Sequence, residues 1–440
     1  MSIEYFEGLA GSGKTFQLTE SLKLFLKSHP LQEDEAILGI TYMHGSRRRM
    51  HARLAEIAEL RGRYVACTVD SVARNLVCRW RSLARVLDPQ LDLAAAPEFA
   101  GICRVAALLA NRECVSAWLK AHYPLVVVDE LQDCREDRLS IVQALASCCH
   151  LIVAADGFQD LQCTGASPAV EWLHGSGGKK NILTGNRRTK QPVLLRAAAR
   201  LRSSADCGDI LGRNLISALN ANVAASGVAR TLHWRQPKDA VILTPTGPEK
   251  CPWIGNVVTR LVSKPIKPSG IQTNVGPFNI AWESNVEEER TDLLAKLGHL
   301  SQCASLPGLQ SACSHDSGAL GDLYRWAEHK FRIKGQVEFS SCELGMAVDR
   351  ILQSRRAFLP TTSLGAVRAM TINQAKNREF EGVIVLWPFM VGGDLESLRR
   401  RLYNALTRAQ KWAVIIVQDD PKESRLTKPP FSMRTAAAAS

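Results

Sequence analysis

Short runs of apolar residues alternate with longer stretches in which apolar residues recur every three or four positions. In the first half of the chain the runs cover residues 3–6, 36–42, 65–69, 125–128 and 151–155. The stretch 16–27 is predicted to be a helix, with Leu18, Leu22, Leu24 and Leu26 as its apolar positions. Strands that are apolar throughout and separated by helices are typical of a parallel sheet that is covered on both faces. The pattern predicts an α/β lobe over residues 1 to about 185.

The same alternation begins again in the second half. Strands are predicted at residues 239–244, 366–372, 383–386 and 412–417, with a helix at 399–409. The stretch from Pro245 to Pro307 contains seven prolines and has weak periodicity, which predicts a loop-rich insertion with one helix around 283–300. Residues 320–356 are predicted to be mostly helical. The end of the chain is rich in Lys, Pro and Ala and is predicted to be disordered.

These patterns divide the chain into two α/β lobes and smaller parts. The first lobe is predicted over 1–77 and 121–185, and the second over 186–245 and 341–420. A small helical subdomain is predicted at 78–120, a reduced accessory subdomain at 246–340 and a disordered tail at 421–440.

A phosphate-binding sequence directly follows the first predicted strand. Residues 8–15 read Gly-Leu-Ala-Gly-Ser-Gly-Lys-Thr and fit the pattern G-x-x-x-x-G-K-[ST]. Its glycines allow a tight turn whose N–H groups face a phosphate at the start of a helix. Lys14 would reach the β- and γ-phosphates, and Thr15 would bind Mg²⁺. The predicted nucleotide contacts are Gly8, Ala10, Gly11, Ser12, Gly13, Lys14, Thr15 and Phe16.

Acidic residues end two further predicted strands. Asp129 and Glu130 follow one apolar run, and Asp156 ends another, with Gln159 three residues later. In open parallel sheets, ligands lie at the carboxyl ends of the strands. Beside a phosphate loop, Asp129 would bind Mg²⁺ and Glu130 would polarise the attacking water, while Gln159 would contact the γ-phosphate or that water. The sequence therefore predicts a site that binds a nucleotide with Mg²⁺ and hydrolyses its γ-phosphate.

The net charge and the cysteine content predict the kind of partner and the cellular compartment of the protein. The 440 residues include 55 basic and 43 acidic side chains, and the net charge of +12 suits a polyanion, nucleic acid first. Thirteen cysteines without a C-x-x-C pair favour free thiols in a reducing compartment. No apolar run is long enough for a membrane span, and the early phosphate loop leaves no room for a signal peptide. We therefore expect a cytoplasmic protein without membrane contact.

The order of the motifs resembles that of superfamily 1 DNA helicases of the UvrD, Rep and PcrA type. Seven blocks carry the resemblance, at 41–44, 68–71, 129–133, 156–159, 186–189, 370–380 and 403–409. The last block, Tyr-Asn-Ala-Leu-Thr-Arg-Ala, is very close to the family's Tyr-Val-Ala-Leu-Thr-Arg-Ala. The resemblance implies an α/β fold with two RecA-like P-loop domains with parallel sheets and an ATP site between them. It also implies reduced, mostly helical accessory subdomains.

The resemblance assigns roles to individual residues. It implies that Gln159 senses the γ-phosphate and that Glu379 contacts the ribose. Arg188 and Arg408 would act on the γ-phosphate as arginine fingers from the second domain. Arg187 stands where the family has a tyrosine that stacks on the base, and a guanidinium can also stack on a π-face. The residues implied to contact nucleic acid are Thr41, Tyr42, Met43, His44, Thr68, Asp70, Ser71, Thr371 and Asn373.

Some positions depart from the family pattern. The aromatic residues that stack on DNA bases after Gln159 are replaced by Asp160, Leu161, Gln162 and Cys163, and Asn373 and Asn377 replace a histidine and a glycine. Two functions stay open. One is an ATP-dependent translocase or helicase on single-stranded or partly duplex DNA, 3′-to-5′ by resemblance. The other is a DNA- or nucleotide-sensing ATPase subunit that does not unwind DNA itself and works in an anti-phage defence or repair complex with a nuclease partner.

Overall fold

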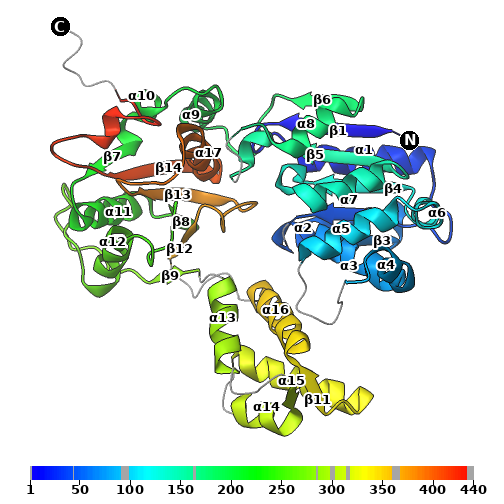
Figure 1. Cartoon of the computed structure of the whole chain (residues 1–440). Helices are drawn as coiled ribbons and strands as arrows, with labels where there is room; N and C mark the ends of the chain where they lie inside the picture. The colour runs from blue at the N-terminus through cyan, green and yellow to red at the C-terminus, as the bar shows by residue number, and fades with distance from the viewer. Residues whose placement is uncertain are drawn as a thin grey trace. The chain divides into compact units, whose positions relative to one another are not determined.

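The computed structural model describes residues 2–42, 44–90, 99–161, 165–283, 286–297, 303–313, 318–358 and 367–433. The chain divides into two compact units: unit 1 comprises 1–87, 103–282 and 366–440, and unit 2 comprises 88–102 and 283–365. Unit 1 contains two six-stranded parallel sheets, each flanked by helices (Figure 1). The predicted α/β fold with two RecA-like lobes is confirmed.

The first sheet has the strand order β3-β2-β4-β5-β1-β6. Its strands are β1 (Ile3–Gly8), β2 (Ile37–Thr41), β3 (Tyr64–Thr68), β4 (Leu125–Asp129), β5 (His150–Ala155) and β6 (Lys179–Leu183). All neighbouring pairs are parallel, so the carboxyl ends of the strands meet at one edge. Thr41, for example, pairs with both Thr68 and Asp129. The predicted strands of the first half are thereby confirmed, and the edge strand β6 is an addition.

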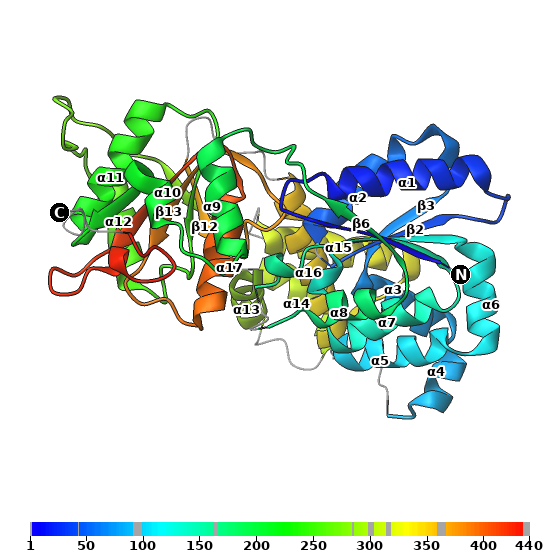
Figure 2. The ribbon, with the colours of Figure 1, turned by 90° about the horizontal axis from the view of Figure 1, so that it is seen from above.

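Helices cover both faces of this sheet. The helices are α1 (Lys14–Ser28), α2 (His44–Ala55), α3 (Val69–Arg79), α4 (Arg81–Leu87), α5 (Phe99–Ala110), α6 (Glu113–His122), α7 (Glu136–Ala146) and α8 (Pro168–Gly175), with single turns η1 (Ala58–Leu60), η2 (Leu131–Asp133) and η3 (Gly157–Gln159). Leu18, Leu22 and Leu26 of α1 pack with Leu125 and Val127 in one core cluster, because their spacing places them on one side of the helix. Figure 2 shows α1 and α2 on one side of the sheet and α3 and α7 on the other.

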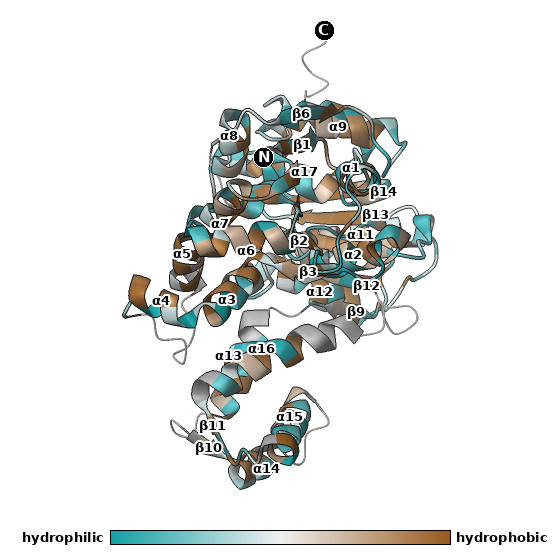
Figure 3. Cartoon of the chain, turned by 90° about the vertical axis from the view of Figure 1, so that its right-hand side faces the viewer, coloured by the Kyte–Doolittle hydropathy of each residue, from teal (hydrophilic) through white to brown (hydrophobic). Residues whose placement is uncertain are grey.

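The second sheet has the strand order β7-β14-β13-β8-β12-β9. Its strands are β7 (Leu215–Ala218), β8 (Ala240–Thr244), β9 (Ile280–Trp282), β12 (Val367–Thr371), β13 (Phe380–Trp387) and β14 (Ala409–Gln418). One core cluster joins Val383 and Val385 to α9 (Pro192–Arg202), α10 (Gly208–Leu211) and α17 (Leu395–Leu406). Another joins Ile384 and Leu386 to α11 (Ala221–Arg235) and α12 (Pro252–Ser263). Successive residues of β13 thus face opposite layers, and β13 is brown in Figure 3.

The borders of the second lobe differ from the prediction. Strand β9 pairs with β12 in the second sheet and helix α12 packs against that sheet, whereas the sequence predicts an accessory subdomain over residues 246–340. Strand β9 has only three residues and lies at the sheet edge, too short to show a periodic pattern. Helix α16 (Ser341–Phe358), assigned to the second lobe, belongs to unit 2.

The predicted disorder from residue 421 is wrong for residues 421–433. A turn η5 (Arg425–Thr427) lies there, and Phe431 is fully buried with its ring centroid 5.8 Å from that of Trp387. Cys207 N and Gly208 N donate hydrogen bonds to Pro430 O and Phe431 O. A single aromatic anchor outweighs the polar composition that predicted disorder. Residues 434–440 lie outside the described part of the chain.

Unit 2 has its own small core. It contains α13 (Val286–Lys296), β10 (Cys303–Ser305), α14 (Leu306–Cys313), α15 (Ala319–Lys334), β11 (Glu338–Ser340) and α16. Leu309, Leu323 and Phe339 are fully buried in one apolar cluster. Its helices show both brown and teal segments in Figure 3, as helices with one buried side do. In the described residues of the whole chain, no helix is long and apolar enough to cross a membrane.

Candidate nucleotide site and nucleic-acid interface

The phosphate loop joins β1 to α1 at the carboxyl edge of the first sheet. Gly11 and Gly13 have φ angles of 80° and 90°, a region that favours glycine. A Cβ atom at Gly13 would also lie 2.9 Å from Cδ of Arg187. Helix α1 begins at Lys14, so its first N–H groups are available to an anion. The loop has the local geometry that the sequence predicts.

Lys14 is buried and folds back over the loop. Its Nζ donates to Gly8 O at 2.9 Å and to Leu9 O at 3.1 Å, and it lies 3.4 Å from Oδ2 of Asp156. Two of these three partners are neutral carbonyls. An ammonium group held in this way can exchange weak partners for a strong one.

Thr15 and Asp129 lie side by side. Thr15 Oγ1 donates to Asp129 Oδ2 at 3.0 Å. Burial, and next the charge of Glu130, raise the pKa of Asp129 to about 6. A buried carboxylate beside a second, partly exposed one is stabilised by a cation, and a hydroxyl with a carboxylate is a suitable oxygen ligand set for Mg²⁺. The predicted metal ligands are therefore together and fit the ion.

Glu130 is held in an unusual backbone conformation. It has a φ of 58°, which is uncommon for a residue with a side chain and costs energy. Gln132 Nε2 donates to Glu130 Oε2 at 2.5 Å, and Asp156 N donates to Gln132 Oε1 at 2.8 Å. Gln132 thus fixes the predicted base relative to the end of β5. Gln132 lies in block 129–133, but the sequence pattern predicts no separate role for it.

A buried polar network surrounds Gln159. Its Nε2 donates to Asp156 Oδ2 at 2.9 Å, and its Oε1 accepts from Nη2 of Arg408 at 3.4 Å. Asp156 also accepts from Nη1 of Arg202 at 2.6 Å. Burial favours the neutral form of this carboxyl group, but Lys14 and Arg202 outweigh it and hold the pKa of Asp156 below its usual value.

Arg408 is a buried cation without an acidic partner at ion-pair distance in the described residues. Besides Gln159 it contacts Asn404, whose carbonyl accepts from Nε at 3.0 Å. Burial, followed by repulsion from Arg188, lowers the pKa of Arg408 to about 9. A buried guanidinium in this state is stabilised by an anionic ligand. This is the environment that an arginine finger needs.

Arg188 and Glu379 form an ion pair. Arg188 Nε lies 2.8 Å from Glu379 Oε1, and its Nη1 donates to Thr407 O at 2.7 Å. Burial alone would raise the pKa of Glu379, but Arg188 and then Gln410 hold it below its usual value. In this arrangement Arg188 is occupied by the residue that is predicted to contact the ribose. A phosphate would have to compete with that carboxylate.

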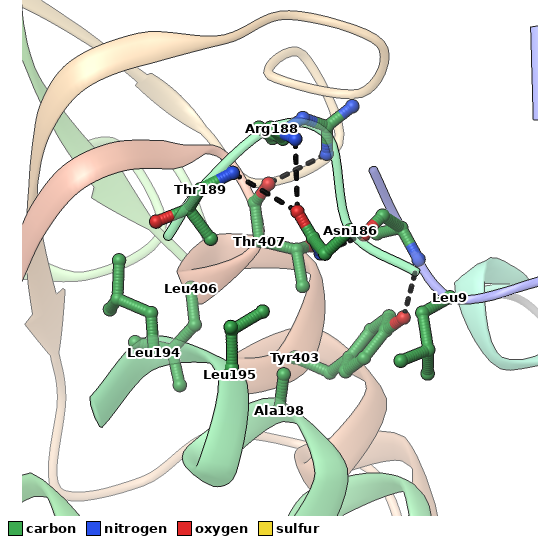
Figure 4. Close-up of a pocket in the computed structure, with 11 residues that line it drawn as sticks. Leu9, Asn186, Arg188, Thr189, Leu194, Leu195, Ala198, Tyr403, Leu406 and Thr407 are labelled. Carbon is green, nitrogen blue, oxygen red and sulfur yellow. Dashed lines mark hydrogen bonds between the residues drawn. The ribbon is translucent and has the colours of Figure 1, made fainter. Parts of the chain in front are cut away.

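The loop that precedes α9 lies on the phosphate loop. Asn186 Nδ2 donates to Ala10 O at 2.9 Å, and Ala10 N donates to the hydroxyl of Tyr403 at 2.9 Å. Asn186 Oδ1 also accepts from the backbone of Arg188 and Thr189 (Figure 4). Arg187 lies 4.0 Å above the ring of Phe16, which is 41% exposed. Phe16 and Arg187 thus form a flat surface beside the loop, as base stacking requires.

The predicted nucleic-acid residues of the first lobe are engaged in local structure. Thr41 is buried at the end of β2. Thr68 caps α3: its Oγ1 accepts from Ser71 N at 3.3 Å and lies 2.9 Å from Ser71 Oγ. Asp70 is paired with Arg138, whose Nε donates to Oδ1 at 2.7 Å, and Arg138 lies over the ring of Tyr42 at 5.6 Å. Met43 and the side chain of His44 lie outside the described part of the chain.

In the second lobe, block 370–380 begins in the last two residues of β12 and ends at the start of β13. Thr371 Oγ1 donates to Gln374 Oε1 at 3.0 Å, whereas Asn373 is exposed. Asn377 has a φ of 62°, where the family has glycine, and asparagine tolerates that conformation better than most residues. Its Nδ2 donates to Ser46 Oγ at 2.7 Å, and Lys376 pairs with Asp133 at 2.7 Å. This block therefore contacts the first lobe directly.

Sequence reasoning missed three residues of this site. They are Gln132, Arg202 and Tyr403, which connect predicted residues to one another. Gln132 and Tyr403 lie inside recognised blocks, so their positions were a signal. Arg202 lies outside every block, and only the fold brings it to Asp156.

The family comparison concerns the second lobe, whereas the structural comparisons extend over nearly the whole chain. The family model of the UvrD-like helicase C-terminal domain matches residues 366–416. No curated protein matches the chain significantly. Among solved structures, the Pif1 helicase from Bacteroides in complex with ADP-AlF3 and single-stranded DNA is 12% identical with a TM-score of 0.41, over 99% of this chain and 91% of that chain. The arterivirus nonstructural protein 10 helicase, solved with DNA, is 11% identical with a TM-score of 0.38. That match covers 96% of this chain but only 62% of the arterivirus chain. The C-terminal part of this chain is thus similar to the UvrD-like helicase C-terminal domain.

Proposed function

We propose that this chain hydrolyses ATP and uses it to translocate on, or unwind, DNA in the 3′-to-5′ direction. One observation carries the proposal: Gln159 of the first lobe links Lys14, through Asp156, to Arg408 of the second lobe. Three of the predicted catalytic residues form this connection, and Asp129 and Glu130 lie at the end of the adjoining strand β4. The match of residues 366–416 to a helicase domain supports the same function.

Each residue has a task in the proposed hydrolysis. Lys14 and Arg408 neutralise charge on the transferring phosphoryl group, and Arg188 joins them when it leaves Glu379. Glu130 orients and polarises the attacking water. Gln159 contacts the γ-phosphate and, through its hydrogen bond with Arg408, couples the presence of that phosphate to the position of Arg408. Mg²⁺, held by Thr15 and Asp129, would supply further charge neutralisation at the phosphates.

The same contacts couple hydrolysis to movement. Tyr403 and Asn186 of the second lobe hold the N–H and C=O groups of Ala10 in the phosphate loop. A movement of the phosphate loop on nucleotide binding or hydrolysis would therefore displace Tyr403 and Asn186 of the second lobe. Repeated approach and separation of the two lobes on a bound strand would produce steps along DNA.

The test is steady-state ATP hydrolysis with and without single-stranded DNA, with Glu130→Gln as the matched control. We expect DNA to stimulate hydrolysis and Glu130→Gln to abolish it, since loss of a catalytic base typically costs about 10²–10⁴-fold. Strand displacement on a duplex with a 3′ overhang then separates unwinding from translocation. Absence of any DNA-stimulated hydrolysis would contradict the proposal.

A second candidate is supported by the loop after Gln159. Asp160 is buried and paired with Arg135 at 2.6 Å, and Arg400 donates to Asp160 O at 3.2 Å and to Gly165 O at 2.7 Å. This position therefore fixes the loop rather than stacking on a base. The alternative function is an ATPase subunit that senses DNA or nucleotide in a complex with a nuclease. Hydrolysis that appears only when a nuclease co-purifies would favour it, and unwinding by the isolated chain would exclude it.

A further inference from the structure

Arg202 is the last residue of α9, in the second lobe, yet it reaches the end of β5 in the first. Its Nη1 lies 2.6 Å from Oδ1 of Asp156, whose side chain is fully buried while that of Arg202 is 33% exposed. The guanidinium also lies 5.8 Å from the centre of the Phe158 ring. Arg202 belongs to none of the blocks that predict function.

Asp156 shares its charge between two cations. Oδ1 contacts Arg202 and accepts from Phe158 N at 3.2 Å, while Oδ2 contacts Lys14 at 3.4 Å and Gln159 at 2.9 Å. In the described residues, Lys14 and Arg202 are the cations within ion-pair distance of this carboxylate. The contact with Lys14 is the longest of the four.

Lys14 can leave Asp156 more easily than Arg202 can. When Lys14 moves to a phosphate, it gives up two carbonyls and one long ion-pair contact. Arg202 stays, so Asp156 keeps a partner and no uncompensated charge is left in the interior. A buried carboxylate without any partner is costly.

We propose that Arg202 is a positioning residue that makes Lys14 available to the nucleotide by neutralising Asp156. This inference rests on the proposed function, because it requires Lys14 to bind phosphate. Without Arg202, Lys14 is the one cation of the described residues at ion-pair distance from Asp156, and it is held more tightly in its folded-back position. A residue of the second lobe thereby sets the nucleotide affinity of the first.

The test is equilibrium binding of Mg²⁺-ADP by isothermal titration calorimetry to four full-length proteins. ADP is the right probe, because Lys14 would reach its β-phosphate while the two predicted arginine fingers act on the absent γ-phosphate. Arg202→Met is expected to weaken ADP binding about tenfold or more, since it leaves a buried pair unbalanced. Arg202→Lys keeps the charge and is expected to bind within about threefold of wild type.

The double variant Arg202→Met with Asp156→Asn decides the mechanism. It removes both buried charges and releases Lys14, so ADP affinity should return to within about threefold of wild type. Normal binding by Arg202→Met, or no recovery in a double variant that melts cooperatively, would overturn the inference. If Arg202→Met does not fold, the double variant alone still tests it, because loss of binding there contradicts the role. A wild-type chain that binds no ADP or ATP would instead refute the proposed function.

Discussion

The nucleotide candidates and the nucleic-acid candidates of the first lobe use their side chains differently. Lys14, Asp129 and Arg408 are buried and only partly compensated: Lys14 holds neutral carbonyls, and Arg408 has no ion-pair partner in the described residues. Thr68 and Asp70, by contrast, are fully used in a helix cap and an ion pair. A buried charge without an opposite charge nearby indicates that a ligand supplies one. A polar group that already has its hydrogen-bond or ion-pair partners needs no ligand to account for its position. The nucleotide assignments therefore have physical support that the nucleic-acid assignments of the first lobe do not have.

The largest expected effect concerns Arg408. Arg408→Ala should lower the single-turnover rate of ATP hydrolysis about 10³-fold or more, because an arginine finger stabilises charge that develops in the transition state. ADP affinity should change little. Lys411→Ala, which removes an exposed cation of the adjoining strand, is the matched control and should leave the rate unchanged. A rate loss below about tenfold in Arg408→Ala would mean that this incompletely paired buried charge does not act on the nucleotide. The contrast with the nucleic-acid residues would then fail.

The sequence was most informative where one short segment contains a complete signal. The strands 125–129 and 151–155 are apolar throughout, and the phosphate loop has its full pattern within eight residues, so both were predicted. Strand β9 is three residues long and could not be recognised without its partner β12. Phe431 anchors a polar tail through Trp387, 44 positions earlier in the chain.

Contacts between residues that are far apart in the chain could not be predicted from the sequence either. The Arg202–Asp156 pair spans 46 positions, and the Ala10–Tyr403 hydrogen bond spans 393. No local pattern encodes such pairs, since they depend on how two separately folded sheets meet. Residue types at the site were therefore predictable, but their partners were not.

The next effect concerns the base. Phe16→Ala should weaken ATP binding about tenfold, because a base that stacks on an aromatic ring gains about 1–3 kcal/mol. Inorganic triphosphate has no base, so its inhibition constant should stay the same. Leu24→Ala, an exposed apolar residue of the same helix, is the control. Equal losses for ATP and triphosphate would mean that Phe16 supports the loop and does not contact the base.

A smaller effect separates the two roles of Asp70. If its carboxylate serves mainly to hold Arg138, Asp70→Asn frees positive charge near Tyr42. DNA affinity should then rise by about two- to fivefold at low salt, with a steeper salt dependence, as one more phosphate contact forms. Fluorescence anisotropy with labelled single-stranded DNA measures this, and Arg138→Gln should change affinity in the opposite direction. Weaker binding by Asp70→Asn would restore Asp70 as a direct DNA contact.

The smallest effect, at Thr68, tests the comparison most directly. Thr68→Ala removes the oxygen that accepts from Ser71 N at the start of α3, and loss of such a cap lowers the free energy of unfolding by about 1 kcal/mol. DNA affinity should stay within about twofold, because the hydroxyl of this 2%-exposed residue is directed to Ser71 and is not available to a phosphate. Urea unfolding and anisotropy on the same protein separate the two effects, with Thr68→Ser as the variant that keeps the cap. A DNA defect in Thr68→Ala without a loss of stability would show that the hydroxyl turns toward nucleic acid when the strand is bound. The contrast between the nucleotide residues and the nucleic-acid residues of the first lobe would then hold only for the protein without its ligands.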